Sequence, residues 1–188
     1  MSARLSSLIF LLAATAWPVA AAETYTIEPK HSSAQFTYEH FGLSHPTGKV
    51  MGAAGTIVLD SDDPARSSVT ASLDMATLTT ALPEFDDLLK GEKYFDIARF
   101  PKATFVSTLV EPTGDKTAKV TGDLTVHGIT QSVVLDVTFN RKAFNPALFK
   151  TGVGFTATTQ LSRKAFGLGN LAPVVGDDIG LVIEVEAY

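Results

Sequence analysis

The stretch Ala118-Lys-Val-Thr-Gly-Asp-Leu-Thr-Val126, followed by His127-Gly128, places apolar or small residues at even positions and polar residues at odd positions. Side chains of a β-strand point alternately to its two faces. The stretch therefore predicts a strand with one buried face and one solvated face, closed by a turn at Gly128.

The same alternation recurs along the chain, in segments separated by clusters of Gly, Pro, Asp and Ser. It predicts eight amphipathic strands, around Ala34–His40, Ile57–Leu59, Val69–Met75, Ala103–Ser107, Ala118–Val126, Val133–Phe139, Phe155–Leu161 and Ile179–Val185. Only Pro83–Gly91 differs: it begins with Pro and acids, spaces its apolar residues as a helix does, and ends with Lys-Gly. We predict one short helix there. A single helix disfavours a parallel α/β fold and indicates an all-β, antiparallel one.

Eight such strands can close into a barrel or stack as a sandwich, and their length favours the barrel because closure removes sheet edges. Small residues on the apolar faces would leave room inside for one ligand: Ala34, Ala71, Ala103, Gly122 and Ala157. The alternative is an interior filled by aromatic residues: Phe36, Tyr38, Phe105, Phe139 and Phe155. An outer-membrane barrel is disfavoured, because the residues facing outward are mostly Thr, Ser, Asp, Lys and Gln.

Composition narrows the function classes. The 188 residues are the length of one domain. A net charge of -5, without a basic cluster, argues against a nucleic-acid-binding surface. The absence of cysteine rules out disulfides, thiolate metal sites and thiol nucleophiles.

The mean hydropathy of +0.18 is raised by the beginning of the chain. Of the first 22 residues 16 are apolar, including the unbroken run Leu8–Ala14, and Ala20-Ala21-Ala22 supplies small residues for a cleavage site. We predict a secretory signal peptide over residues 1–22, a mature domain over 23–188, and a periplasmic location, with secretion as the alternative. A membrane anchor is disfavoured, because spanning needs about 20 residues and Trp17-Pro18 interrupts the stretch.

Candidate catalytic groups are few. The histidines at 31, 40, 45 and 127 show no metal-ligand spacing, and no nucleophile-elbow, zinc-protease or phosphate-loop motif occurs. Asp86, Asp87 and Asp96 are more typical of solvated or helix-capping acids. We therefore predict no enzyme activity, no metal and no cofactor.

Several motifs in order resemble the YceI-like family of polyisoprenoid-binding proteins. They are Tyr25–Ser32 with Phe36, Tyr38 and His40; Gly48–Asp60; Lys93–Asp96 with Phe100–Ser107; Gly122–Thr130; and Arg163–Gly167. The resemblance covers Tyr25 to Tyr188. It implies a lipocalin-like antiparallel barrel that holds a polyprenyl or quinone-like lipid. Two positions depart from the family pattern, Ala165 before Phe166-Gly167 and Asp86–Leu89 near the helix, and they leave the contacts to a ligand head group undefined.

On this resemblance we expect a carrier whose tail pocket is lined by Phe36, Tyr38, Phe95, Phe105, Leu124, Phe155 and Phe166, with His40 or Arg163 near its polar end. Its partners would be a polyisoprenoid or quinone lipid and, transiently, a membrane for loading, with no nucleic acid; a homodimer is left open. The alternatives are a structural or stress-related periplasmic protein with a filled core and no lipid and, less favoured, a hydrolase using His40.

Overall fold

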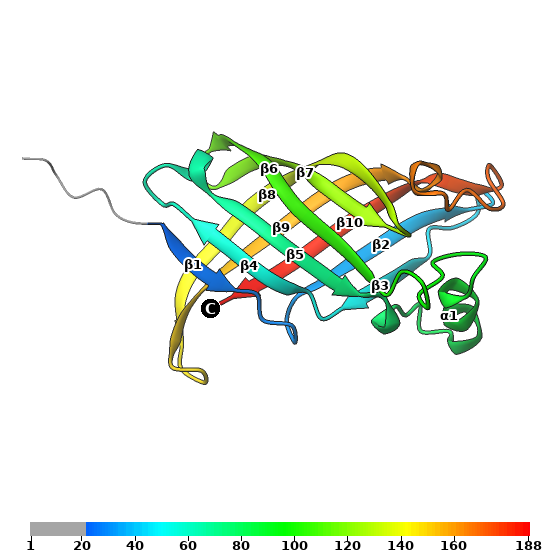
Figure 1. Cartoon of the computed structure of the whole chain (residues 1–188), viewed down its shortest axis with the longest axis horizontal. Helices are drawn as coiled ribbons and strands as arrows, with labels where there is room; N and C mark the ends of the chain where they lie inside the picture. Colours follow the sequence, from blue (N-terminus) through cyan, green and yellow to red (C-terminus); the bar gives the residue numbers. More distant parts are fainter. Residues whose placement is uncertain (1–21) are drawn as a thin grey trace, which may run out of the picture.

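A computed structural model describes residues 22–188, so the signal peptide predicted for residues 1–22 lies, except for Ala22, outside the described residues. One antiparallel sheet of ten strands curls around its own interior (Figure 1). The strands are β1 (Glu23–Thr26), β2 (Ser33–His40), β3 (Thr47–Met51), β4 (Ala54–Leu59), β5 (Ser68–Asp74), β6 (Lys102–Gly114), β7 (Thr117–Val126), β8 (Ile129–Asn145), β9 (Lys150–Ser162) and β10 (Val175–Ala187). Their order in the sheet is β1-β4-β5-β6-β7-β8-β9-β10-β2-β3.

The all-β, antiparallel prediction is confirmed, but the count of eight strands was wrong. The eight predicted segments correspond to β2 and β4–β10, whereas β1 and β3 were not predicted. A first break in the extended chain separates β1 from β2, and a second break separates β3 from β4. Pro29 has no N–H to donate and lies in a turn at the first break. Gly52 at the second break has a φ of 78°, a conformation that favours glycine.

Ser32 joins the two breaks to the last strand. Its side chain is fully buried, and its Oγ donates to the carbonyl of Glu186 (3.2 Å) and accepts from the N–H of the same residue (3.0 Å). The Ser32 carbonyl accepts the N–H groups of Gly52 and Ala53, each at 3.1 Å. The backbone and side chain of Ser32 thus provide hydrogen bonds at the two breaks, where regular strand pairing is interrupted.

Both ends of the strand order are hydrogen-bonded elsewhere. Beside β1, the N–H of Thr26 donates to the Tyr188 carbonyl (2.8 Å), and the N–H of Tyr188 donates back (2.9 Å). Beside β3, Lys49 and Thr79 exchange N–H···O bonds of 2.8 Å. Each edge strand is therefore partly covered by hydrogen bonds to residues outside the strand order.

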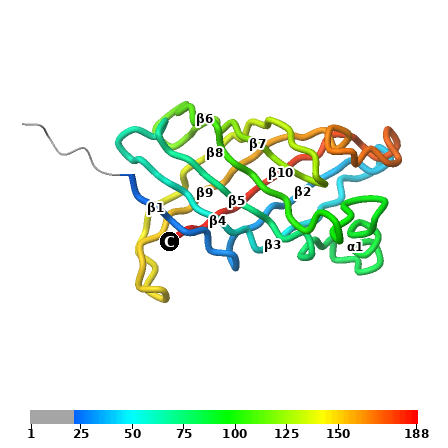
Figure 2. Tube along the Cα trace, in the orientation of Figure 1, coloured from blue at the N-terminus to red at the C-terminus, as the bar shows by residue number. Residues whose placement is uncertain are grey.

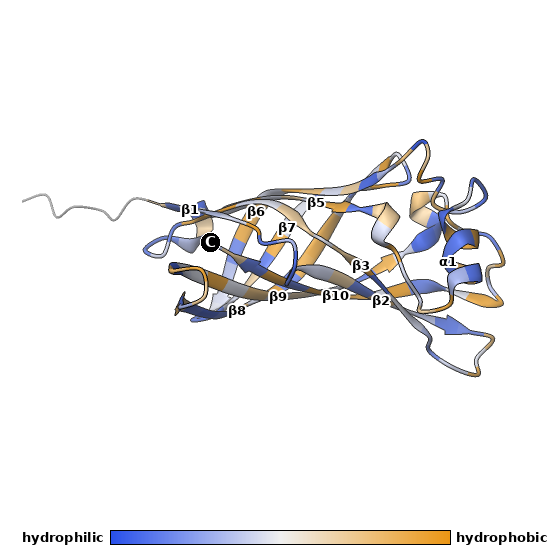
Figure 3. Ribbon diagram, turned by 90° about the horizontal axis from the view of Figure 1, so that it is seen from below, coloured by the Kyte–Doolittle hydropathy of each residue, from blue (hydrophilic) through white to orange (hydrophobic). Residues whose placement is uncertain are grey.

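Side-chain alternation determines what faces that interior. Hydrophobic and hydrophilic residues alternate along the strands (Figure 3). In β7, Val120 is 7% exposed and lies in a core cluster with Val133, Leu135 and Ala157, as the period-two pattern predicted. The polar residues between them, such as Lys119 and Asp123, are exposed.

The single α-helix, α1 (Pro83–Lys90), confirms the predicted short helix. Pro83 occupies its first turn, where the missing N–H is harmless, and Gly91 caps its end. Leu89 is buried in a cluster with Leu78. Three 3-10 turns complete the fold: η1 (Pro64–Arg66), η2 (Met75–Thr77) and η3 (Arg163–Phe166).

The barrel-like sheet has two distinct ends (Figures 1 and 2). At one end lie α1, the β2–β3 turn and the loop after η3, residues 167–174; we call it the α1 end. At the other end the hairpin between β8 and β9 projects past the sheet, and we call it the hairpin end.

Candidate functional site

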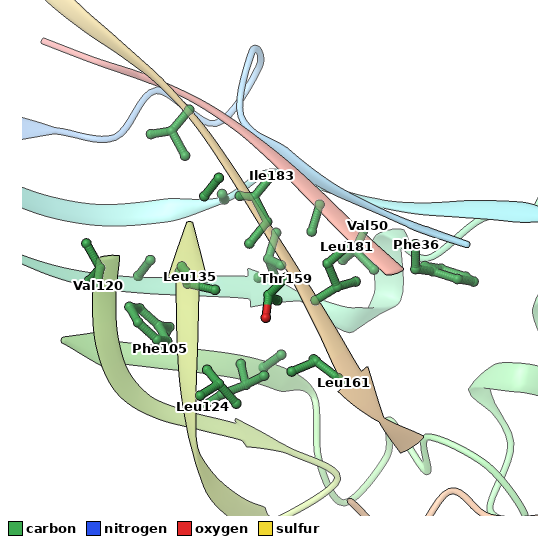
Figure 4. A pocket seen from close by; sticks show the side chains of 18 of the residues that line it. Phe36, Val50, Phe105, Val120, Leu124, Leu135, Thr159, Leu161, Leu181 and Ile183 are labelled. Carbon is green, nitrogen blue, oxygen red and sulfur yellow. The ribbon is translucent and has the colours of Figure 1, made fainter. Parts of the chain in front are cut away.

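A cavity of about 670 Å³ lies inside the curled sheet. Its walls are almost wholly apolar, and Figure 4 shows side chains from several strands directed into one space. The labelled residues are Phe36, Val50, Phe105, Val120, Leu124, Leu135, Thr159, Leu161, Leu181 and Ile183. Thr159, the polar residue among them, donates its hydroxyl to the Val134 carbonyl (2.8 Å) and so offers no spare proton to a guest. A filled core is therefore disfavoured.

All nine residues expected at the pocket line this cavity. They are Phe36, Tyr38, His40, Phe95, Phe105, Leu124, Phe155, Arg163 and Phe166. Contact of these side chains with a ligand stays a prediction, whereas their convergence on one space is a structural finding. The family resemblance named these residues. Those that lie on strands meet because inward positions of neighbouring strands share one face of the sheet.

Two aromatic rings are kept against the wall by glycines on neighbouring strands. A Cβ at Gly48 would lie 2.2 Å from the Phe36 ring, and a Cβ at Gly122 would lie 2.4 Å from the Phe105 ring. Phe36 and Phe105 therefore occupy space over a neighbouring glycine that a larger residue would take.

Arg163 is committed to the backbone of the α1 end. Its Nε donates to the Gly176 carbonyl (2.7 Å), its Nη2 to Val175 (2.6 Å), and its Nη1 to Asn170 (2.8 Å) and Leu168. These bonds hold the loop 167–174 across the end of the sheet. Arg163 thus positions this loop, and a contact between Arg163 and a ligand head group stays a prediction.

Tyr38 and His40 are two further polar side chains in the cavity lining. Desolvation raises the pKa of Tyr38 above its ordinary value of 10.0, so the phenol stays protonated at neutral pH and keeps a donor. The His40 ring is exposed and packs edge-on against Phe41, 4.5 Å between centroids. Both can hydrogen-bond to an oxygen near the α1 end.

The cavity lining changes character along its length. At the α1 end it includes the exposed apolar residues Phe41, Leu88 and Leu171. In the loops distant from α1 it consists largely of polar or small residues: Asp60, Ser61, Pro64, Ser67, Ser68, Pro112, Gly114, Asp115, Lys116 and Thr117. Residues of this second set were interpreted from sequence only as hairpin connections or not singled out.

Asp60 was missed as a lining residue because it looked like an ordinary turn acid. It is 4% exposed and accepts the N–H groups of Asp63 (2.9 Å) and Asp62 (3.1 Å), and Arg66 pairs with it. The Asp63 hydrogen bond, aided by Arg66, lowers the pKa of Asp60 below 3.8. It therefore stays a carboxylate that rigidifies the β4–β5 loop.

Of the three acids expected to be solvated or capping, Asp87 is exposed, but Asp86 and Asp96 are buried, and Asp96 pairs with Arg99 (3.4 Å). Asp86 is buried and accepts bonds from the Thr80 N–H and hydroxyl (2.6 Å each) and from the Thr79 hydroxyl (2.8 Å). Its role is to hold the turn before α1, as a capping acid does. Within residues 22–188 no three His, Asp or Glu side chains form a group that could hold a metal ion. The helices of the same residues include none long and apolar enough to cross a membrane.

Comparison with known proteins gives concordant matches. The family model described as "YceI-like domain" matches residues 25–187. A "UPF0312 protein" of Pseudomonas savastanoi pv. phaseolicola is 36% identical over 146 residues, 78% of this chain and 76% of the relative. The crystal structure of BcnA from Burkholderia cenocepacia superposes with a TM-score of 0.75 at 22% identity, covering 84% of this chain and 96% of that one.

A further solved structure is described as a polyisoprenoid binding domain from Saccharophagus degradans, implicated in plant cell wall breakdown. It has a TM-score of 0.69 and 13% identity, and the match covers 87% of this chain and 97% of that domain. At this identity the likeness shows a shared fold.

Proposed function

Because the chain belongs to the YceI-like domain family, we propose that it binds one long-chain polyisoprenoid lipid inside the sheet and carries it through the periplasm. The observation that carries the proposal is the apolar cavity of about 670 Å³. This volume falls within the roughly 300–1,000 Å³ of small-molecule sites. A solved structure of the same fold is described as a polyisoprenoid binding domain, which supports this class of ligand.

Hydration favours such a guest over water. A buried water needs two to four polar partners, and the central wall of the cavity offers almost none. Each CH₂ that leaves water for an apolar site gains about 0.8 kcal/mol. An isoprenoid tail, which is wholly hydrocarbon, can take up this gain along the whole wall.

The free energy of the tail in a bilayer, compared with that in the cavity, supports a carrier over a permanent store. Lipid tails in a bilayer are about as apolar as Leu side chains, so transfer between bilayer and cavity should be nearly balanced in free energy. What the protein removes is the cost of exposing the tail to water between membranes. Tyr38 and His40 would face the oxygen of an alcohol, phosphate or quinone head group.

The test is to purify the protein from its native host, extract it with organic solvent and identify the lipid by mass spectrometry. We expect a prenyl lipid in a ratio near one per chain. Its absence, together with failure of the purified protein to take up a polyprenol, would contradict the proposal and favour a ligand-free structural role. Fractionating the host cells tests the periplasmic location separately.

A further inference from the structure

Exposed apolar side chains surround the α1 end. We call the rim the set Phe41, Leu43, Leu82, Leu88, Leu171 and Val174, whose exposed fractions run from 48% to 86%. They come from three separate segments: the β2–β3 turn, α1 with the residue before it, and the loop 167–174 (Figure 1). Large exposed apolar groups that gather from several segments indicate an interaction site.

The rim is continuous with the cavity. Phe41, Leu88 and Leu171 are exposed and also line the cavity, so one apolar surface runs from the interior to the outside. A second exposed apolar group, the hairpin tip (Phe144, Leu148 and Phe149), is absent from the cavity lining. Exposed residues line the cavity at both ends, but only at the α1 end do they include large apolar side chains.

Hydrogen bonds hold the rim segments together. The N–H of Phe41 donates to the Val174 carbonyl (3.0 Å), and the Asn170 side chain donates to the Lys93 carbonyl beyond α1. Phe41 and Leu171 have φ values of 56° and 63°, which bulky residues rarely adopt. Fixed neighbours must maintain these conformations, and such outliers cluster at functional sites.

We propose that the rim is a docking surface for a zwitterionic lipid bilayer, through which the bound lipid enters and leaves; this rests on the proposed function. A bilayer is favoured as the occupant because the exposed apolar residues of the rim continue the apolar lining of the cavity, so a lipid tail could pass between the two without crossing a polar surface. The charges on and after α1 are mixed, with Glu84 and Asp87 beside Lys90 and Lys93, and the whole chain carries -5. Docking must then come from apolar burial, since no basic cluster is present to attract anionic lipids.

The test compares two triple variants. Leu43→Ser, Leu82→Ser and Val174→Ser change rim residues that do not line the cavity, and Ser suits the Leu82 position because it caps α1. Phe144→Ser, Leu148→Ser and Phe149→Asn change the hairpin tip, with Asn chosen because Phe149 has a φ of 52°. Two quantities are measured: flotation of each protein with dioleoylphosphatidylcholine vesicles, and the rate at which a fluorescent polyprenol moves from protein to vesicles.

For the parent protein we expect flotation, and a transfer rate that rises with vesicle concentration. The rim variant should lose flotation and transfer about tenfold more slowly, which corresponds to about 1.4 kcal/mol. The hairpin variant should stay within about twofold of the parent, as surface changes usually do. Equal losses in both variants, or an unaffected rim variant, would overturn the proposal.

The two proposals fail in different ways. If the parent takes up no polyprenol but floats, and only the rim variant stops floating, the carrier function fails and the docking surface stands. If the parent loads polyprenol but releases it at a rate independent of vesicle concentration, the docking surface fails and the lipid-binding function stands.

Discussion

The two ends of the sheet are built differently although both expose aromatic and aliphatic groups. At the α1 end, three segments are bonded to one another and Arg163 holds the loop 167–174 through four backbone carbonyls. At the hairpin end, the ion pair between Lys142 and Glu23 (2.7 Å) is largely exposed, and the cavity lining in the loops distant from α1 is largely polar. The difference teaches that the cavity has a direction: its lining is apolar and fixed by hydrogen bonds at the α1 end, and largely polar at the other end.

Substitutions in β7 give the strongest test of the difference between the two ends, because the inward face of this strand extends from one end of the cavity to the other. Val126→Phe narrows the cavity beside α1, and Ala118→Phe narrows it at the other end. If lipid enters at the α1 end, Val126→Phe should weaken uptake of every polyprenol at least tenfold. Ala118→Phe should weaken only long tails, by about 0.8 kcal/mol for each CH₂ that no longer fits.

Uptake of polyprenols of graded length, followed by fluorescence displacement, gives the measurement. Thr158→Phe on the outward face of β9 is the control for a bulky substitution and should bind as the parent does. A reversed order, with Ala118→Phe the more damaging variant for short tails, would place the opening at the polar end.

Substitutions of Arg163 and Lys142 compare how much each end contributes to the free energy of unfolding. Arg163→Gln should lower the free energy of unfolding by about 3 kcal/mol, because four backbone carbonyls, three of them in part-buried bonds, lose charge-assisted hydrogen bonds. Lys142→Gln should have a far smaller effect, because solvent screens an exposed pair. Urea unfolding gives both values, and amide hydrogen exchange should show lost protection in the loop 167–174 only for the first variant. Equal destabilisation by the two changes would mean that the α1 end is not specially fixed.

Two glycine substitutions test, with a smaller expected effect on stability, how tightly side chains pack against the sheet. Gly48→Ala forces a Cβ into the Phe36 ring near the α1 end, and such overpacking typically costs 1–3 kcal/mol, so we expect about 2 kcal/mol. Gly154→Ala in β9 meets nothing closer than 3.8 Å and should change stability by less than about 0.5 kcal/mol. Thermal unfolding of the two variants decides the point, and a destabilising Gly154→Ala would show that glycine is needed for a reason other than the ring.

Acid should act differently on the two ends. The Thr80 hydrogen bonds lower the pKa of Asp86 below its ordinary 3.8. Its contribution to stability is therefore complete above that pH and is lost as the pH falls through the folded-state pKa. Asp86→Asn should lower stability at neutral pH and flatten the decline below pH 3.8.

At the hairpin end, the hydrogen bond from Lys142 lowers the pKa of Glu23 below 4.5. Added salt should abolish the contribution of the exposed Glu23–Lys142 pair to the pH dependence of stability. The contribution of Asp86, which is buried, should remain. Urea unfolding at several pH values, with and without salt, measures both. An Asp86 dependence that disappears in salt would contradict the geometry described for it.

Alternation made most strands and their faces predictable, since burial of one face imposes the period directly, and the family resemblance supplied the pocket residues. Strands β1 and β3 were missed, because both are short and are placed by contacts across the sheet, such as those of Ser32 with Glu186 and Gly52. Small inward residues such as Gly122 indicated room inside, but no local pattern shows that Gly48 and Gly122 lie under the Phe36 and Phe105 rings. Arg163 was expected at a ligand because a cation near a pocket resembles a head-group contact, and only the loop geometry revealed its four carbonyl partners.

The hydroxyl of Ser32 has a consequence for how the chain folds. Its bonds to Glu186 join residues 154 positions apart, beside the pairing of β2 with β10 that brings the first part of the chain onto the last strand. Such non-local pairing slows folding, because loop-closure entropy is lost before the contacts can form. The barrel interior should therefore be assembled last, and a lipid present at that step would encounter hydrophobic walls that are still open.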